Sequence, residues 1–346
     1  MSRVMPSAAT MKPSTDKKHP TASPERAPLI GFINVDKPAG WTSHDVVAKV
    51  RGLLRTPSDP ACPAGRSPKV GHVGTLDPMA TGILPLCIGK ATKVSRYLMA
   101  EQKQYQAVMK LGERTDTQDA TGIVVSSVPV PALDREQIEA VCREFVGSIE
   151  QLPPMFSAVK IGGAPLYKAA RLGRVVERTT RRVEIASLRV LAVEGPLVTI
   201  DVECSKGTYI RTLCADIGDR LGVGAHVCQL QRRRVGSFTL EQAVTLEQVE
   251  AAIRSGAIES LLTPIDRALE HLPLVLVDEA TAGRVRHGVA VPASAARTTA
   301  ALTIGREVRI QAGQGDVLAI GVVTPDAAGW KIRIDTVLAE AERLPA

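Results

Sequence analysis

The chain has 346 residues, of which 45% are hydrophobic and 3% aromatic, and its formal net charge at pH 7 is +7. This length exceeds that of a usual single domain, so we expect one large domain and a smaller one. No apolar run approaches the roughly 20 residues that a membrane-spanning helix needs, which excludes an ordinary helical membrane protein. Six scattered cysteines form no CxxC pair, so a zinc finger or disulfide framework is disfavoured and a reducing cytoplasm is expected.

The N-terminal quarter opens with residues 1–28, which are rich in Pro, Ser, Thr and Lys and lack the apolar centre of a signal peptide, so they predict a disordered tail. Residues 29–35 are apolar and predict a strand that ends at a Pro- and Gly-containing turn over 36–40. Thr42 and Asp45 have the spacing of a capping box, which predicts a helix. The apolar stripe of that helix comprises Val46, Val47, Val50 and Leu54.

A glycine-framed loop follows a flexible segment predicted over 57–69. The stretch GHVGTLDPMATG, residues 71–82, sets one carboxylate, Asp77, between glycines, with Pro78 directly behind it and His72 before it. An isolated Asp-Pro pair is typical of a turn or helix cap. Glycines, however, adopt backbone conformations that other residues avoid and let a ligand approach closely, so we interpret this loop as a candidate site. Beyond it, ILPLCIG predicts a buried strand.

Three other chemistries could use a loop of this kind: phosphate binding, glycoside hydrolysis and metal binding. A phosphate-binding P-loop is rejected, because six residues separate Gly82 from Gly89 and Ala91 follows Lys90 where Ser or Thr would bind magnesium. A glycosidase needs a second carboxylate, and the sequence leaves this open. The acids that could approach Asp77 in space are Asp116, Asp119, Asp201 and Asp216. The His and Cys positions show no metal-ligand spacing.

Further along the chain, residues 103–111 alternate as a strand should and place Tyr105 on its apolar face. Asp134 predicts the cap of a helix with Gly147 at its end, and residues 198–204 alternate again. A turn at 205–207 leads into a helix whose stripe is Ile210, Leu213, Cys214, Ile217 and Leu221.

One arginine of that last helix stands out. Arg211 lies one residue off the stripe, beside Tyr209. Arg211 is either an exposed, solvated arginine or a residue at the entrance of a site, where its guanidinium pairs with a carboxylate.

The positive charge is concentrated in one segment. Residues 151–182 carry seven Lys or Arg and one Glu, a net charge of +6, whereas residues 270–346 have a net charge of −1. A local basic patch favours a polyanionic partner, although a solvated surface is the alternative. From about residue 272 the stretches VRHGVAVP, EVRIQA, VLAIGVV and KIRIDTV predict short strands of a small β-barrel-like module. Strands and helices in irregular order predict an α+β fold with a mixed or antiparallel sheet.

Five blocks in fixed order carry a resemblance to a known family. They span residues 34–47, 71–93, 103–122, 153–173 and 204–236. Together they make the chain similar to the TruB-type tRNA pseudouridine synthases. The likeness covers about residues 29–270, and residues 272–346 resemble a PUA-like RNA-binding domain. It implies a pseudouridine synthase fold, with a mixed and largely antiparallel sheet, in the 29–270 domain.

The resemblance implies an isomerase that converts uridine 55 in the T-loop of tRNA to pseudouridine by base flipping and an aspartate-dependent glycosidic exchange. It also implies no cofactor and no metal, the tRNA T-arm as partner, a monomer without an obligate protein partner, no membrane association and a cytoplasmic location.

By matching motifs, Asp77 corresponds to the catalytic aspartate, Tyr105 to a tyrosine stacked on the target base, and Arg211 to the arginine paired with the aspartate. The basic segment 151–182 corresponds to a mobile insertion that clamps the T-arm. The residues implied in substrate binding are His72, which helps fill the space left by the flipped nucleotide, Tyr209, Leu230 of the pocket, and the Lys37-Pro38 motif. The loop at 57–69 is longer than the family pattern, and the N-terminal tail is extra.

Two other functions stay open at this point. The same fold could act on another target, as a guide-dependent or messenger-RNA pseudouridine synthase. The basic groove could also serve a non-catalytic RNA-binding protein or tRNA-folding chaperone. The combination of Asp77, Tyr105 and Arg211 argues against a purely binding role.

Overall fold

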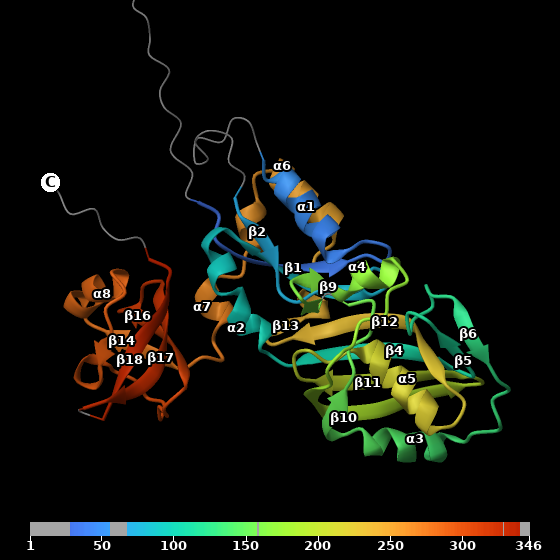
Figure 1. Cartoon of the computed structure of the whole chain (residues 1–346). Coiled ribbons are helices and arrows are strands. Elements are labelled where there is room, and N and C mark those ends of the chain that lie inside the picture. The colour runs from blue at the N-terminus through green and yellow to red at the C-terminus, as the bar shows by residue number, and fades with distance from the viewer. Residues whose placement is uncertain (1–27, 56–67, 158, 328, 340–346) are drawn as a thin grey trace, which may run out of the picture.

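Two sheets dominate the computed structural model, which describes residues 28–55, 68–157, 159–327 and 329–339 (Figure 1). The predicted tail, apart from its last residue, and most of the predicted loop at 57–69 lie outside these ranges. The larger sheet has nine strands, with β1-β3-β12-β4-β11-β10-β7 as its path, β2 beside β3 and β13 beside β12. Within this path only β12 and β3 run parallel, so the α+β fold with a mixed, largely antiparallel sheet is confirmed.

The strands of the larger sheet are β1 (Gly31–Lys37), β2 (Val70–His72), β3 (Thr81–Ile88), β4 (Lys103–Leu111), β7 (Gly147–Gln151), β10 (Arg181–Glu194), β11 (Leu197–Cys204), β12 (Ala225–Val235) and β13 (Phe238–Thr239). Two small hairpins are β5 (Glu113–Thr115) with β6 (Val124–Ser127), and β8 (Lys160–Ile161) with β9 (Ala164–Pro165). The α-helices are α1 (Ser43–Leu53), α2 (Ser95–Met99), α3 (Arg135–Glu144), α4 (Leu166–Arg171), α5 (Ile210–Arg220), α6 (Leu246–Arg254), α7 (Ile265–Ala268) and α8 (Glu279–Arg286). The 3-10 turns are η2 (Gly89–Lys93), η3 (Leu240–Gln242), η4 (Ile258–Leu261) and η5 (Ala293–Ala295).

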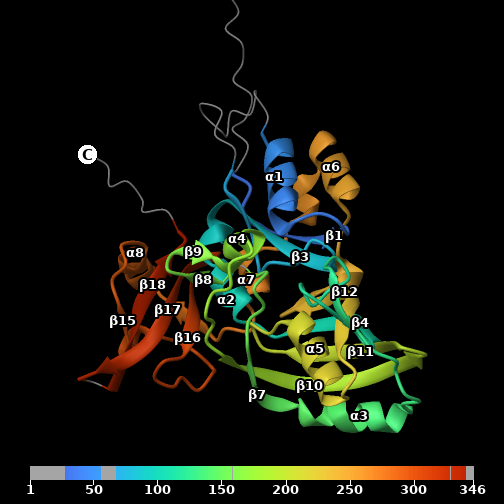
Figure 2. The same ribbon diagram turned by 45° about the vertical axis from the view of Figure 1, so that its right-hand side comes forward.

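Helix α1 forms as its sequence predicts. The Thr42 side chain accepts a hydrogen bond from the amide of Asp45, whose carboxylate accepts one from the Thr42 amide, so the capping box is complete. The four residues of the predicted stripe are buried. Helix α1 lies beside α6, and an ion pair of 2.8 Å joins Lys49 to Glu250 (Figure 2).

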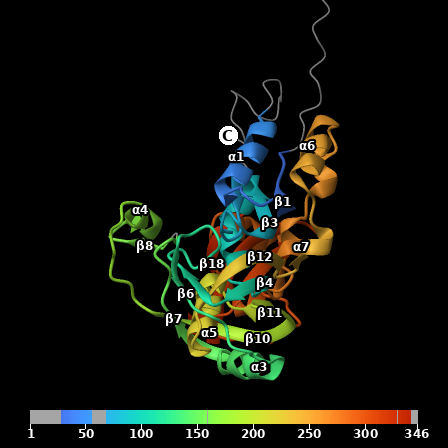
Figure 3. The ribbon, with the colours of Figure 1, turned by 90° about the vertical axis from the view of Figure 1, so that its right-hand side faces the viewer.

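The centre of the larger sheet is held by alternating side chains and by covering helices. Every second residue of β4 is buried, as the period of a half-buried strand requires. Helix α5 packs against β12, and α3 packs against β10. Helix α3 begins at the predicted cap but ends at Glu144, and Gly147 instead opens strand β7 with φ +98°. The insertion that carries β8, β9 and α4 projects away from this body (Figure 3).

The C-terminal sheet has five strands in the order β14-β16-β17-β18-β15. Their bounds are β14 (Leu274–Val277), β15 (Val291–Pro292), β16 (Glu307–Ala312), β17 (Val317–Asp326) and β18 (Gly329–Val337). Tyr97 and Leu98 of the larger unit share one apolar cluster with Val317 and Ile320, so the C-terminal unit is docked through buried side chains.

One predicted strand of this unit was wrong. The stretch VRHGVAVP begins in helix α8, and only its last two residues form β15. Asp278 caps α8 by accepting from the amide of Thr281 at 2.8 Å, and Gly288, with φ +77°, follows the helix end. Val285 is therefore buried because it lies on the inner face of a helix. Eight residues are too few to distinguish this helical period from the alternation of a strand.

No helix among the described residues combines the length and apolarity that crossing a membrane requires.

Candidate active site

Asp77 sits in the connection between β2 and β3, and the start of α1 holds this connection in place. The amide of Leu76 donates to the Ser43 hydroxyl at 2.8 Å, and that hydroxyl lies 3.2 Å from the Leu76 carbonyl. The amide of Ala80 donates to the Asp77 carbonyl at 3.1 Å, which closes a turn around the acid. The Asp77 side chain keeps 31% of its surface exposed, so a bound molecule can reach it.

The predicted Lys37-Pro38 motif holds the same turn from the other side. The Lys37 ammonium is buried and donates to the carbonyls of Pro38, Trp41 and Pro78 at 2.9, 2.7 and 3.2 Å. Burial lowers the pKa of Lys37 to about 8, although the nearby Asp77 opposes this shift. Lys37 thus acts on the backbone behind Asp77, and Pro38 supplies one of the carbonyls that orient it.

Two glycines of the loop are required by geometry. Gly74 and Gly82 have φ values of +78° and +93°, in the region that side chains rarely adopt. A Cβ on Gly82 would lie 2.2 Å from the backbone oxygen of Arg232 on the neighbouring strand. These glycines therefore serve the close approach of β12 as well as the turn.

Arg211, on the first turn of α5, is buried and forms an ion pair with Asp77, the pair that the family resemblance implied. Its Nε and Nη2 donate to the two carboxylate oxygens of Asp77 at 2.8 and 3.1 Å, a bidentate arrangement. Its remaining donors reach the carbonyls of Thr117 and Phe156, each at 2.8 Å. The solvated alternative for this arginine is thereby wrong, since only 3% of its side chain is exposed.

Sequence reasoning missed that Asp119 belongs to this cluster, although it left Asp119 among the acids able to approach. Asp119 is buried, and its Oδ2 lies 3.5 Å from Nη1 of Arg211. Its other oxygen accepts from the amide and hydroxyl of Thr121 and from the hydroxyl of Thr117. Gln118 lies between Thr117 and Asp119 and has a φ of +62°. In the described ranges it is the only residue other than glycine with a left-handed backbone. Among the described residues, Asp116, Asp201 and Asp216 form no hydrogen bond or ion pair with Arg211 or Asp77, and Asp201 instead pairs with Arg189.

The electrostatics of Asp77 are a balance between burial and its cation. Burial raises the pKa of Asp77 above its ordinary value, and the charge and hydrogen bonds of Arg211 oppose that rise. The nearby Asp119 adds to the rise. Arg211 therefore favours the ionised form of Asp77, which burial disfavours.

Tyr105 and Leu230 lie on adjacent strands at the centre of the sheet. In the register of β4 with β12, Leu230 lies opposite Ala107, and Arg232 lies opposite Tyr105. Both Tyr105 and Leu230 are more than nine-tenths buried. Burial raises the pKa of the Tyr105 phenol, and the charge of Arg232 partly opposes it. The phenol is therefore protonated at neutral pH.

His72 ends strand β2, beside the loop. Its ring meets that of His44 edge to face, with 5.5 Å between centroids. Burial, together with the charges of His44 and Arg232, lowers the pKa of His72 to about 4, so its imidazole is neutral at pH 7.

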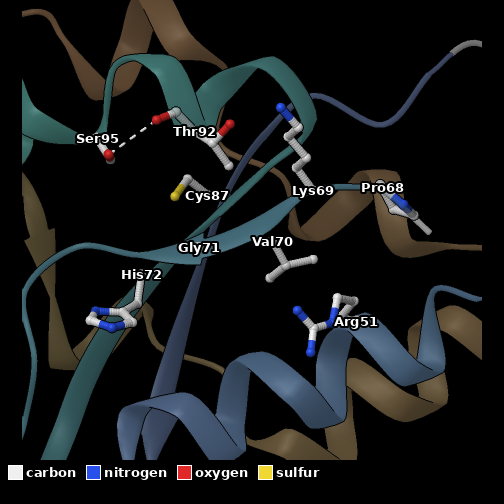
Figure 4. Close-up of a pocket in the computed structure, with 9 residues that line it drawn as sticks. All are labelled: Arg51, Pro68, Lys69, Val70, Gly71, His72, Cys87, Thr92 and Ser95. Carbon is white, nitrogen blue, oxygen red and sulfur yellow. Dashed lines mark hydrogen bonds between the residues drawn. The ribbon is translucent and has the colours of Figure 1, made fainter. Parts of the chain in front are cut away.

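A hollow of about 450 Å³ adjoins His72 (Figure 4). Arg51 of α1 and Lys69, before β2, line it, and neither contacts a carboxylate in the described part of the chain. These two cations beside the loop fit a polyanionic partner.

Tyr209, the last candidate, directly precedes α5 and contacts residues at both ends of the basic segment 151–182. Its amide donates to the side chain of the buried Gln151 at 2.8 Å, and Gln151 donates back to the Tyr209 carbonyl at 3.0 Å. The guanidinium of Arg181 lies 5.3 Å from the Tyr209 ring centroid. Tyr209 thus links the insertion to the helix that carries Arg211.

Among the described residues, no group of three or more His, Cys, Asp or Glu side chains is placed to hold a metal ion. Asp77, Arg211 and Asp119 form one charged cluster, and the charge of Asp77 adds to the raised pKa of the buried Tyr105 phenol. That arrangement can act as a nucleophile or stabilise a developing cation.

Comparison with known proteins places these motifs in a family. Residues 64–210 match the family model described as TruB family pseudouridylate synthase (N terminal domain), and residues 211–270 match the tRNA pseudouridylate synthase B C-terminal domain. The chain is 47% identical to a tRNA pseudouridine synthase B of Stutzerimonas stutzeri (strain A1501), across 87% of this chain and 94% of the relative. It is 43% identical to a tRNA pseudouridine synthase B of Moorella thermoacetica (strain ATCC 39073 / JCM 9320), across 87% and 96%.

Solved structures with the same fold belong to larger assemblies. The fold is similar to that of a chain in a Cbf5-Nop10-Gar1 complex, with a TM-score of 0.69, 31% identity, and coverage of 90% of this chain and 86% of that one. A structure of an H/ACA RNP bound to a substrate RNA containing 2'-deoxyuridine gives a TM-score of 0.69 at 28% identity, across 91% and 87%.

Proposed function

The chain belongs to the TruB family of pseudouridylate synthases, enzymes that isomerise uridine in RNA, and from this premise we propose that it converts uridine 55 in the T-loop of tRNA to pseudouridine. The observation that carries the proposal is the bidentate pair between Arg211 and Asp77 in a glycine-framed loop next to Tyr105. The relatives at 43–47% identity bear the name tRNA pseudouridine synthase B, which supports tRNA as the substrate.

The reaction first requires the target base to leave its stack. Extrusion of a base costs a few kcal/mol, which contacts to phosphates and stacking on an aromatic ring offset. We assign the stacking on the target base to Tyr105, with Leu230 as a further residue of the pocket. We assign to His72 the filling of the space that the flipped nucleotide leaves.

The chemical step exchanges one glycosidic bond for another. The bond between N1 of uracil and C1′ of ribose breaks, the base turns, and C5 bonds to C1′. The proton on C5 leaves and N1 gains one, so the product is an isomer of the substrate. Asp77, ionised through Arg211, serves as a nucleophile at sugar or base, or stabilises the positive charge that develops. We assign to Tyr105 the acceptance or relay of the proton from C5.

RNA binding is assigned to the basic insertion and to the C-terminal unit. The insertion over 151–182 has a net charge of +6 and joins the site twice, through the Phe156 carbonyl on Arg211 and the Arg181 contact with Tyr209. We therefore assign residues 29–270 as the catalytic domain, with this insertion as its clamp on the T-arm. Residues 272–346 are assigned as a PUA-like domain that helps hold the tRNA. The chain is proposed to act as a monomer in the cytoplasm, without an obligate protein partner.

A guide-dependent activity is the second candidate, because the similar solved structures include an H/ACA RNP. The higher identity to proteins named tRNA pseudouridine synthase B favours the stand-alone reaction.

The deciding experiment incubates the purified chain, without guide RNA or other protein, with an unmodified tRNA transcript and maps pseudouridine along it. We expect conversion at uridine 55 alone, and none in a transcript with cytidine at that position. Absence of conversion, or conversion elsewhere, would overturn the proposal, and recovery on addition of a guide RNA would favour the second candidate.

A further inference from the structure

Arg232, on β12, is a buried cation that the proposed chemistry leaves unexplained. It is the largest fully buried side chain, with 1% of its surface exposed. In the described ranges it forms no ion pair with a carboxylate, unlike its neighbours Arg233 and Arg234. Burying a charge without a counter-ion is costly, and an apolar side chain of similar volume often serves stability as well or better.

The guanidinium of Arg232 spans the two ends of the Asp77 loop. Its Nε donates to the carbonyl of Ile83, just after the loop, at 2.8 Å, and its Nη2 donates to the carbonyl of Gly74, just before Asp77, at 3.1 Å. One rigid planar group thus fixes the separation of the chain segments that enter and leave the loop.

The third neighbour of this guanidinium is the phenol of Tyr105. The two residues lie opposite each other in the register of β12 with β4, and the charge of Arg232 opposes the rise that burial causes in the pKa of Tyr105. Gly82 lets the Arg232 backbone come this close, since a Cβ there would meet the Arg232 carbonyl at 2.2 Å. Arg232 therefore hydrogen-bonds to both ends of the loop that presents Asp77 and lies opposite the tyrosine assigned to the target base.

We propose that Arg232 is a positioning residue of the reaction, which fixes the Asp77 loop against Tyr105 so that carboxylate and phenol meet the flipped uracil in one geometry. The inference rests on the proposed function. A catalytic group misplaced by about 1 Å can cost on the order of a hundredfold in rate, so a side chain that sets this distance affects chemistry without touching RNA. Lysine cannot replace it, because a single ammonium lacks the planar fork that reaches the carbonyls of both Ile83 and Gly74.

The test compares Arg232→Lys and Arg232→Met with Arg234→Met. Arg234 lies two residues along the same strand and pairs with Glu203 at the surface of the sheet, so it controls for loss of a β12 arginine. For each variant, thermal unfolding, affinity for unmodified tRNA and the single-turnover rate at saturating enzyme are measured. We expect both Arg232 variants to convert tRNA about a hundredfold more slowly, with affinity within about threefold of wild type, and Arg234→Met to match wild type.

The outcomes separate the possible failures. Conversion by Arg232→Lys within about threefold of wild type would overturn the inference, even if Arg232→Met does not fold. A rate loss matched by an equal loss of tRNA affinity would also overturn it, because that pattern marks a general structural role. The wild-type measurement tests the proposed function independently of the variants. If the wild-type protein does not convert uridine 55, the proposed function is wrong.

Discussion

Replacement of Arg211 by lysine is the sharpest perturbation of the charged cluster. The guanidinium makes four hydrogen bonds of 2.8–3.1 Å, two to Asp77 and one each to Thr117 and Phe156. A lysine keeps the charge, but its single nitrogen cannot reach all four acceptors that the three guanidinium nitrogens reach, so we expect about two of these bonds to be lost. At about 1.5 kcal/mol for each charge-assisted bond, the loss is about 3 kcal/mol, or on the order of a hundredfold in rate.

The same variant should change the pH dependence. In the proposed reaction Asp77 acts as a carboxylate, and its pKa lies above the ordinary aspartate value because of burial. The single-turnover rate therefore falls as the pH falls through that raised pKa. Weaker hydrogen bonding from lysine removes part of the opposing effect of Arg211, so the acid limb should move to higher pH in Arg211→Lys. Single-turnover conversion of saturating tRNA, measured between pH 5 and pH 8, tests both expectations.

Arg220→Lys provides the matched control. Arg220 ends the same helix, is exposed, and pairs with Glu144 at 2.6 Å, so its replacement should leave both rate and acid limb unchanged. If Arg211→Lys converts tRNA at the wild-type rate with an unshifted acid limb, the ion pair does not serve the reaction and its role is structural.

The remaining predictions concern the acid, the insertion and the buried lysine. Asp77→Asn should bind tRNA normally yet lose conversion, because an amide neither attacks nor neutralises a cation; near wild-type single-turnover conversion would refute this. Joint replacement of Arg171, Arg174 and Arg178 by alanine should weaken tRNA binding and flatten its salt dependence, and an unchanged slope would count against the clamp. Burial lowers the Lys37 pKa from 10.5 to about 8, so the unfolded chain binds more protons between these values. The unfolding free energy of the wild type should accordingly rise with pH between about 8 and 10.5 relative to that of Lys37→Met. An equal pH dependence of the two unfolding free energies, measured by chemical denaturation, would contradict this.

Local signals in the sequence were sufficient for much of the fold. The capping box of Thr42 and Asp45 set the start of α1, and strict alternation set β4, because these patterns involve residues within one turn or one strand. The glycines around Asp77 likewise indicated a constrained loop, since a positive φ is a local property. Where two periods overlapped in a short window, at VRHGVAVP, the sequence failed to separate helix α8 from strand β15.

The composition of the site depended on tertiary structure. Arg211 meets Asp77 across 134 residues, and the sequence supplied this pair only through family resemblance. Asp119 joins them because the turn after β5 returns to α5, and Arg232 spans the loop because β12 lies between β3 and β4. No local periodicity encodes such neighbours, because the order of strands in the sheet, rather than the order of residues in the chain, decides which side chains share a buried, low-dielectric space.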